Sequence, residues 1–240
     1  MLASGLRQRS SKRIRLIYIT DSQGRRSWES YLEKHSKLTL KQGLEEGTML
    51  EKIRKYLDTC SRCNLCKTRT HVVPGEGCPT AKLMCIGEGP GYYEDQMGRP
   101  FVGASGQLLD KILAASGFSR QTNTFIANIV KCRPPQNRDP FPEEREACLP
   151  FLLKQIEVIN PPIIVLLGAT ALKGLIDPNA RITELRGRWL EWNGRLVMPT
   201  FHPSALLRNP ELKRPVWEDF KHVIDKYREI ADPNHHSDYY

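Results

Sequence analysis

Short β-rich runs alternate with helical stretches over most of this chain, and this alternation restricts it to an α/β fold. The β-rich runs are residues 83–86, 124–130, 163–167 and 195–201, and the helical stretches lie near residues 105–116, 143–159 and 169–176. A closing helix is expected over residues 216–230, where apolar residues recur at helical spacing. Because right-handed crossovers place such strands side by side, we predict a three-layer α/β/α fold with a short, mostly parallel central sheet.

The chain is expected to divide into an arm, one main domain and a tail. With 240 residues, of which 40% are hydrophobic, it can bury one good-sized core. Residues 1–48 lack helical periodicity and are expected to form a basic, poorly ordered arm with one strand-like run at 14–19, followed by the main domain over 49–231. The polar tail 232–240 is expected to fray, with His235 and His236 in solvent.

The formal net charge of +9 favours a polyanionic partner, and nucleic acid is the first candidate. A basic surface that only keeps the protein in solution is the plainer interpretation. No apolar stretch approaches the ~20 residues that span a bilayer, so we expect no membrane partner.

The seven cysteines, at positions 60, 63, 66, 78, 85, 132 and 148, are an odd number. A full set of disulfides would leave one thiol over, which favours a reducing compartment, and we predict a cytoplasmic protein. Cys60, Cys63 and Cys66 are each separated by two residues, a spacing typical of metal or cluster ligands. The residues alone leave zinc and an iron-sulfur cluster equally open.

A glycine-rich segment over residues 87–103 directly follows the first strand of the expected main domain. Five glycines and two prolines there allow unusual backbone geometry and a close approach of the main chain to a ligand. Glu88, Glu94, Asp95 and Phe101 add side chains with useful chemistry. Because ligands bind beyond the carboxyl ends of parallel strands, we expect this loop to line a pocket.

Two further motifs are expected at the same end of the sheet. Asn128 lies in the second β-rich run, and Phe201-His202-Pro203-Ser204 follows the last. Each has a plainer explanation, since an asparagine can satisfy buried backbone and a histidine before proline is often structural. The strand-end rule nevertheless brings Asn128 and His202 to the glycine loop.

Taken together, three segments resemble the iron-sulfur family 4 uracil-DNA glycosylases. They are the glycine loop, the run Asn128-Ile129-Val130-Lys131-Cys132-Arg133-Pro134-Pro135-Gln136-Asn137-Arg138, and Phe201-His202-Pro203-Ser204 with the following Leu206-Leu207-Arg208-Asn209-Pro210. The similarity covers about residues 57–230 and includes the order of the motifs. It implies the superfamily's α/β/α fold and excision of uracil from single- or double-stranded DNA by a monomeric enzyme that flips the base.

The resemblance also assigns roles in the pocket. It implies that a flipped uracil stacks on Phe101, pairs with Asn128 and receives a hydrogen bond at O2 from His202. Glu88, with the backbone of Gly89 and Pro90, is similar to the family's turn for uracil and water, and Glu94 flanks uracil C5. His202 and Glu88 are the catalytic candidates, although DNA phosphates could supply part of the electrostatics in place of Glu88.

The same comparison implies a [4Fe-4S] cluster held by Cys60, Cys63, Cys132 and Cys148. Cys66 departs from the family pattern and receives no role, while Cys78 and Cys85 are interpreted as structural thiols. Leu206, Leu207 and Arg208 resemble the loop that enters the space left by the flipped base. Plausible phosphate contacts are Lys131, Arg133, Arg138 and residues 186–188.

Two alternatives remain beside this interpretation. A relative that traps uracil covalently would need an inserted histidine loop, and histidines occur only at positions 35, 71, 202, 222, 235 and 236. A non-enzymatic iron-sulfur or zinc module that binds nucleic acid would account for the cysteines and the charge. It would leave Glu88, Phe101, Asn128 and His202 without a purpose.

Overall fold

The computed structural model describes residues 48–240. The expected arm, apart from residue 48, and the strand-like run at 14–19 lie outside the described residues. Among the helices between residues 48 and 240, none combines the length and the apolar character that a membrane span requires.

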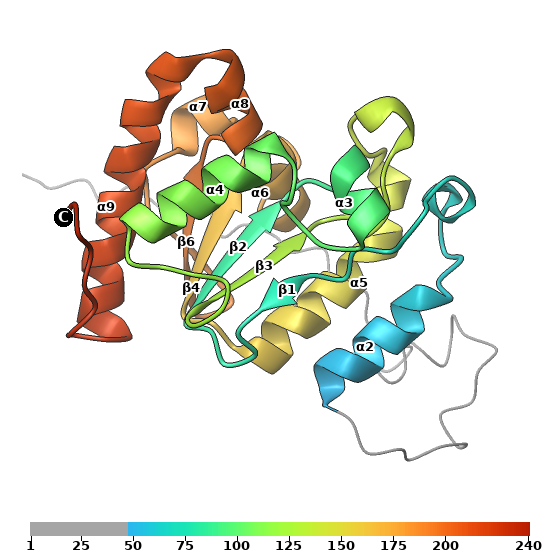
Figure 1. The fold of residues 1–240 in the computed structure, drawn as a ribbon, viewed down its shortest axis with the longest axis horizontal. Helices are drawn as coiled ribbons and strands as arrows, with labels where there is room; N and C mark the ends of the chain where they lie inside the picture. The colour runs from blue at the N-terminus through green and yellow to red at the C-terminus, as the bar shows by residue number, and fades with distance from the viewer. Residues whose placement is uncertain (1–47) are drawn as a thin grey trace, which may run out of the picture. The chain divides into compact units, whose positions relative to one another are not determined.

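A six-stranded sheet with strand order β1-β3-β2-β4-β6-β5 forms the centre of the structure (Figure 1). The strands are β1 (Glu76–Gly77), β2 (Leu83–Gly87), β3 (Thr124–Asn128), β4 (Ile163–Leu167), β5 (Leu190–Trp192) and β6 (Arg195–Thr200). The four inner strands pair in parallel, whereas β1 and β5 join the two edges as antiparallel strands. The mostly parallel sheet predicted from the sequence is therefore confirmed.

Helices cover both faces of this sheet, which completes the three-layer architecture. In chain order they are α2 (Met49–Asp58), α3 (Tyr92–Met97), α4 (Ala104–Ala115), α5 (Pro142–Ile159), α6 (Ala169–Leu175), α7 (Ile182–Leu185), α8 (Pro203–Arg208) and α9 (Lys213–Ile230). Single-turn 3-10 helices lie at η1 (Asn64–Lys67), η2 (Pro135–Asn137) and η3 (Pro210–Leu212).

The inner strands are rich in apolar residues because both of their faces are covered. Every residue of β2, β3 and β4 is buried. One core cluster joins residues such as Leu83, Val165 and Met198 of the sheet to the apolar sides of α4, α8 and α9. These interactions hold the carboxyl ends of the strands in fixed register.

The chain reverses direction across the sheet at β2. From β2 it passes to β3 on one side, and it then crosses to β4 on the other side of β2. Ligands of open α/β sheets bind at such a reversal, outside the carboxyl ends of the strands. The glycine-rich loop that begins at Gly87 lies at this point.

The amino-terminal helix α2 begins with a complete capping box. The Thr48 hydroxyl accepts from the backbone N–H of Glu51 at 3.3 Å, and the Glu51 carboxylate accepts from the backbone N–H of Thr48 at 2.6 Å. Its apolar residues Ile53 and Leu57 are buried, and the helix contacts α5. This contact places the end of α2, and the cysteines that follow, beside α5.

The carboxyl-terminal segment packs against the domain, so the prediction of a frayed tail with a solvated His235 is wrong. The His235 ring is 7% exposed and stacks on Phe118 with ring centroids 4.3 Å apart. Its Nε2 lies 2.8 Å from the carbonyl oxygen of Ser116, and the Ser237 hydroxyl donates to the carbonyl of Ala115. Hydrogen bonds to the end of α4 therefore fix a stretch that its polar composition alone would leave loose.

We expect His235→Ala to lower the free energy of unfolding by about 1–3 kcal/mol, because the change removes a buried ring stack and a hydrogen bond. The neighbouring His236→Ala is the matched control, since the His236 side chain is 80% exposed, and it should change stability by less than about 0.5 kcal/mol. Urea unfolding of both variants measures the difference. Equal effects would contradict a packed tail.

Candidate active site and cysteine cavity

Gly87, Phe101 and Asn128 converge at the carboxyl ends of β2 and β3. A Cβ atom at Gly87 would lie 2.6 Å from Phe101 Cζ and 2.6 Å from Asn128 Oδ1. Only a glycine therefore lets the aromatic ring and the amide meet at the strand end. Gly87 and Asn128 are also direct partners in the register of the two strands.

The Asn128 side chain is 1% exposed, and its Oδ1 has no hydrogen-bond partner among the described residues. A buried acceptor without a partner costs on the order of 1–3 kcal/mol. An unpaired acceptor at the end of this strand therefore points to a functional role. The Asn128 backbone carbonyl, by contrast, accepts from Lys131 Nζ at 2.9 Å. The main chain is thus fixed while the amide oxygen stays available to a ligand.

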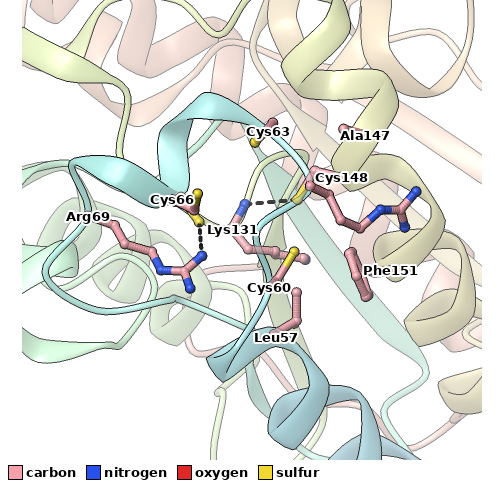
Figure 2. A pocket seen from close by; sticks show the side chains of 11 residues that line it. Leu57, Cys60, Cys63, Cys66, Arg69, Lys131, Ala147, Cys148 and Phe151 are labelled. Carbon is pink, nitrogen blue, oxygen red and sulfur yellow. Dashed lines mark hydrogen bonds between the residues drawn. The ribbon is translucent and has the colours of Figure 1, made fainter. Parts of the chain in front are cut away.

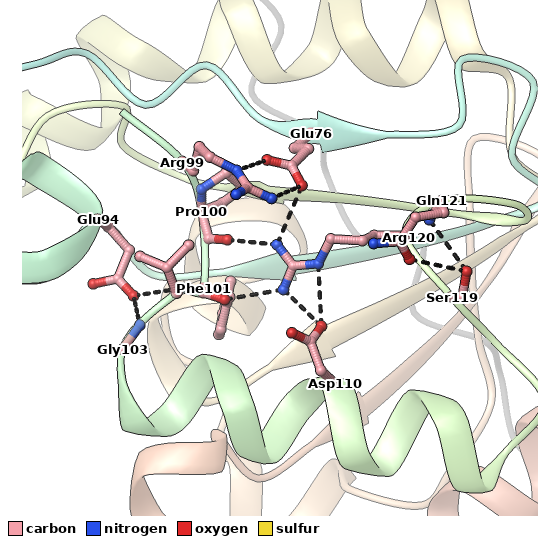
Figure 3. Close-up of polar contacts among 11 residues, drawn as sticks. Glu76, Glu94, Arg99, Pro100, Phe101, Gly103, Asp110, Ser119, Arg120 and Gln121 are labelled. Atoms are coloured by element: carbon pink, nitrogen blue, oxygen red, sulfur yellow. Dashed lines mark hydrogen bonds and ion pairs between the residues drawn. The ribbon is translucent and has the colours of Figure 1, made fainter. Parts of the chain in front are cut away.

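The Phe101 backbone lies in the left-handed region, with a φ of 53°, which is unusual for a bulky residue. Arg120 holds it there, because its guanidinium donates to the carbonyl of Pro100 at 2.8 Å and to that of Phe101 at 2.9 Å (Figure 3). The carboxylates of Asp110 and Glu76 neutralise the guanidinium, with their oxygens 2.7 and 3.6 Å from its nitrogens. The Arg120 side chain is only 5% exposed, so this network is a buried brace.

Glu94 closes the glycine-rich loop from the inside. Its carboxylate accepts from the backbone N–H groups of Val102 and Gly103, both at 2.8 Å, and from that of Gly91 at 3.2 Å. Figure 3 shows the carboxylate directed at Gly103. Three charge-assisted hydrogen bonds from one buried side chain give the loop a single shape.

His202 is the N-cap of α8, and its surroundings determine its protonation state. Its Nδ1 accepts from the backbone N–H of Ser204 at 3.1 Å, so the ring proton of the neutral form is on Nε2. Burial, together with the nearby positive charge of Arg208, lowers the pKa of His202 to about 4. The ring lies beside Phe101, with centroids 5.6 Å apart.

Glu88 lies at the reversal point between β2 and β4. Thr170 of α6 donates its hydroxyl to the Glu88 carboxylate at 2.5 Å. Burial raises the pKa of Glu88, and the hydrogen bond from Thr170 opposes that shift without reversing it. A half-buried carboxylate with a raised pKa is a reasonable proton acceptor.

The structure corrects part of the loop predicted to enter DNA. Leu206 is 1% exposed and packs in the core cluster with α4 and α9, so it is a structural residue. Leu207 is 48% exposed and Arg208 is also exposed. These two side chains are the ones available to a partner.

Most of the basic residues suggested as phosphate contacts have partners inside the protein. Lys131 is fully buried, with Nζ 2.7 Å from Gln155 Oε1, so its assignment as a phosphate contact is wrong. Arg138 pairs with Glu144, and Arg186 pairs with the buried Asp219. Among the suggested residues that the structure describes, Arg188 is exposed, and Arg133 is partly exposed and donates to Asn137 Oδ1 at 2.7 Å.

Five of the seven cysteines line a single cavity between the end of α2, the loop after β3 and the start of α5 (Figure 2). They are Cys60, Cys63, Cys66, Cys132 and Cys148. The two others, Cys78 and the fully buried Cys85, do not line it. The four residues suggested as cluster ligands are thus brought together from three chain segments, with Cys66 beside them.

Two donors in the cavity partly offset the cost of negative charge on the buried sulfurs. Burial raises the pKa of Cys132 to about 11 and that of Cys148 to about 12, so the thiolates need positive charge nearby. Arg69 donates to the sulfur of Cys132 at 3.1 Å, and the backbone N–H of Lys131 donates to that of Cys148 at 3.3 Å. All seven cysteines are free thiols.

Within residues 48–240, no three Cys, His, Asp or Glu side chains lie close enough together to hold a single metal ion. A zinc ion needs its sulfur ligands about 2.3 Å from one point. A polynuclear cluster binds each thiolate through a different iron atom and so accepts wider spacing. The four cysteines suggested as ligands offer the thiolate set that such a cluster takes.

Two important residues of the site were not identified from the sequence. Arg120 lies in the turn after α4, and Thr170 opens α6, far along the chain from the loop they support. Neither position carries a local signal, because each acts through a contact that only the fold creates. Lys131 was identified, but with the wrong role.

Comparison with known proteins agrees with this architecture. The sequence profile described as "Uracil DNA glycosylase superfamily" matches residues 74–221. That segment contains the sheet, the pocket residues and the loop after His202. The chain belongs to the uracil DNA glycosylase superfamily.

Individual relatives show which group of the superfamily the chain belongs to. The chain is 50% identical to a type-4 uracil-DNA glycosylase of Thermotoga maritima over 177 residues, which are 72% of this chain and 92% of that protein. It is 44% identical to the type-4 enzyme of Sulfurisphaera tokodaii, over 76% of this chain and 84% of that protein. A type-5 uracil-DNA glycosylase of Thermus thermophilus is 33% identical, over 66% of this chain and 80% of that protein. Within the superfamily the chain belongs with the type-4 group, and the resemblance read from its motifs is confirmed.

We expect Arg120→Gln to lower the free energy of unfolding by about 2–4 kcal/mol, because it leaves two buried carbonyls unpaired and removes the hydrogen bonds that hold the strained backbone at Phe101. Arg99→Gln is the matched control, since Arg99 also pairs with Glu76 but has a side chain that is 51% exposed. The control should cost less than about 1 kcal/mol. Chemical denaturation compares the two, and similar losses would contradict the brace.

Proposed function

We propose that this protein hydrolyses the N-glycosidic bond of deoxyuridine in DNA and leaves an abasic site. The observation that carries the proposal is the buried, unpartnered amide oxygen of Asn128 beside the Phe101 ring. A planar base that presents an N–H to that oxygen satisfies both groups at once. The type-4 uracil-DNA glycosylases named above support the same activity.

Recognition of uracil follows from the Asn128 amide. Its oxygen can accept from uracil N3–H while its NH₂ donates to uracil O4, and the base stacks on Phe101. Cytosine presents an acceptor and an amine in the reverse arrangement, so it would leave buried polar atoms unpaired. A site of this kind discriminates strongly because unpaired buried groups are costly.

His202 supplies the donor for the leaving base. When the glycosidic bond breaks, positive charge develops on the sugar and negative charge on the uracil. A neutral imidazole with its proton on Nε2 donates to uracil O2 as that charge grows, so it stabilises the transition state more than the ground state. The bond from Ser204 to Nδ1 keeps the ring in the required tautomer.

Glu88 orients the attacking water in this proposal. Thr170 fixes one carboxylate oxygen and leaves the other for the water, and the raised pKa of Glu88 suits it to accept a proton. The backbone of Gly89 and Pro90 continues the same turn and contributes to the uracil site. Glu94 acts indirectly, since its hydrogen bonds fix the wall that faces uracil C5.

The DNA-binding face consists of the loops around the pocket. Leu207 fills the space that the flipped base leaves, as an apolar wedge does in other base-flipping proteins. Arg208, with Arg133 and Arg188, contributes phosphate contacts, and the net charge of +9 supports association with DNA. One chain supplies every group of the pocket, which supports a monomeric enzyme.

Cys60, Cys63, Cys132 and Cys148 are proposed to hold a [4Fe-4S] cluster. When bound, the cluster cross-links the segment after α2, the loop after β3 and the start of α5. Arg69 and the backbone at Lys131 offset the thiolate charge. Seven unpaired cysteines agree with a reducing compartment, which supports a cytoplasmic location.

Asn128→Asp should reduce uracil release from an oligonucleotide about 100-fold or more, because a carboxylate has no N–H donor for uracil O4. Affinity for undamaged duplex should change little, since the residue lies inside the pocket. Alkaline cleavage at abasic sites measures the activity, and circular dichroism checks the fold. Full activity would exclude this recognition mode, and an unfolded variant would mark Asn128 as structural.

Anaerobically purified protein should contain about four iron atoms per chain and absorb broadly in the visible range. Cys132→Ala should lose both the iron and the absorption, whereas the control Cys78→Ala should keep them because Cys78 does not line the cavity. Cys66→Ala should also keep its iron. Stoichiometric zinc in place of iron would overturn the cluster, and binding of uracil DNA without any release would favour a non-enzymatic module.

A further inference from the structure

Two tyrosines at the start of α3 are exposed to solvent at the edge of the pocket. The side chains of Tyr92 and Tyr93 are 51% and 63% exposed, and their rings meet edge to face with centroids 5.4 Å apart. Neither ring belongs to the core, and none of the pocket roles assigned above uses them. Two adjacent aromatic rings left in solvent call for a partner with flat apolar surfaces.

Their position connects them to both loops that form the pocket. A Cβ atom at Gly103 would lie 3.4 Å from Tyr93 Cδ2, so Tyr93 lies close to the loop that carries Phe101. The Arg133 guanidinium lies 5.1 Å from the centre of the Tyr92 ring and belongs to the loop that follows Asn128. Figure 1 shows α3 near the arrowheads of β2 and β3, where that loop also lies.

The chemistry of this surface fits unpaired nucleotides. Aromatic side chains stack with any base, and an arginine beside them attracts the phosphates and adds a cation–π contribution. Arg133 Nε donates a hydrogen bond to Asn137 Oδ1 at 2.7 Å, and this bond holds the guanidinium over the Tyr92 ring. The basic net charge of the chain complements a DNA strand.

We propose that Tyr92, Tyr93 and Arg133 form a stacking platform for the unpaired bases next to the flipped uridine in single-stranded DNA. The inference rests on the proposed uracil excision and deepens it by naming the substrate form that this surface favours. In a duplex the neighbouring bases already stack on one another and pair across the helix. They are therefore unavailable to the platform, and its contribution is confined to single strands.

The test compares wild-type holoprotein with Tyr92→Ala/Tyr93→Ala, with Tyr92→Phe/Tyr93→Phe and with Tyr239→Ala. Tyr239 is 73% exposed and lies in the carboxyl-terminal segment, so it controls for loss of an exposed tyrosine away from the pocket. Each protein is assayed on one uracil-containing strand, alone and annealed to its complement. A fluorescent adenine analogue next to the uracil reports stacking directly.

The double alanine variant should bind and process the single strand about tenfold less well, the size expected for the loss of one base–aromatic stack. Its performance on the duplex should stay within about twofold, because the platform does not reach paired bases. The phenylalanine variant should match wild type, since stacking needs the ring and not the hydroxyl. Wild-type protein should also quench the adenine analogue in the single strand, and the double alanine variant should not.

Equal losses on single strand and duplex, or no loss on either, would overturn the platform while leaving uracil excision intact. Failure of the wild-type holoprotein to release uracil from both substrates would instead overturn the proposed function. The two failures are therefore distinguishable in the same set of assays.

Discussion

The pocket depends on a buried guanidinium that holds the backbone at Phe101. Left-handed geometry at a bulky residue costs on the order of 1–3 kcal/mol, and Arg120 offsets that cost through hydrogen bonds to two consecutive carbonyls. Gly106 makes the arrangement possible, because a Cβ there would lie 2.0 Å from the Phe101 carbonyl carbon. The ring is thereby set against Asn128 before any ligand arrives, and a prearranged site loses less entropy on binding.

The cysteine cavity and the pocket share one short stretch of chain. Asn128 ends β3, and Lys131 and Cys132 follow within four residues. The buried Lys131 connects the pocket to the cavity, since its Nζ donates to the Asn128 carbonyl and to Oε1 of Gln155 in α5. The proposed cluster, by cross-linking the cysteines, would therefore stiffen the segment that carries Asn128, the residue proposed to recognise uracil.

The sequence was sufficient where local pattern and topology act together. Four apolar runs and their intervening helices predicted the parallel sheet, and the strand-end rule predicted that the glycine loop, Asn128 and His202 would meet. Prediction from the sequence failed where a contact between distant segments decides whether a side chain is buried. His235 is polar, yet a stack on Phe118 buries it. Leu206 directly precedes the exposed Leu207 and Arg208, yet it joins the core of α4 and α9. Arg120 and Thr170 acquire their roles only once distant segments are in place.

Burial shifts the pKa values of the two residues proposed as catalytic groups in opposite directions. It lowers the pKa of His202 and raises that of Glu88, because a desolvated site disfavours the charged form of each. The His202 ring of the folded protein therefore stays neutral, and able to donate, until the pH falls to about 4, well below its ordinary pKa of 6.5. Its contribution to stability is complete above pH 6.5 and is lost as the pH falls toward 4, since the unfolded chain takes up the proton first. In the proposed reaction, the neutral imidazole would donate from Nε2 to the negative charge that develops on the base and would stabilise it.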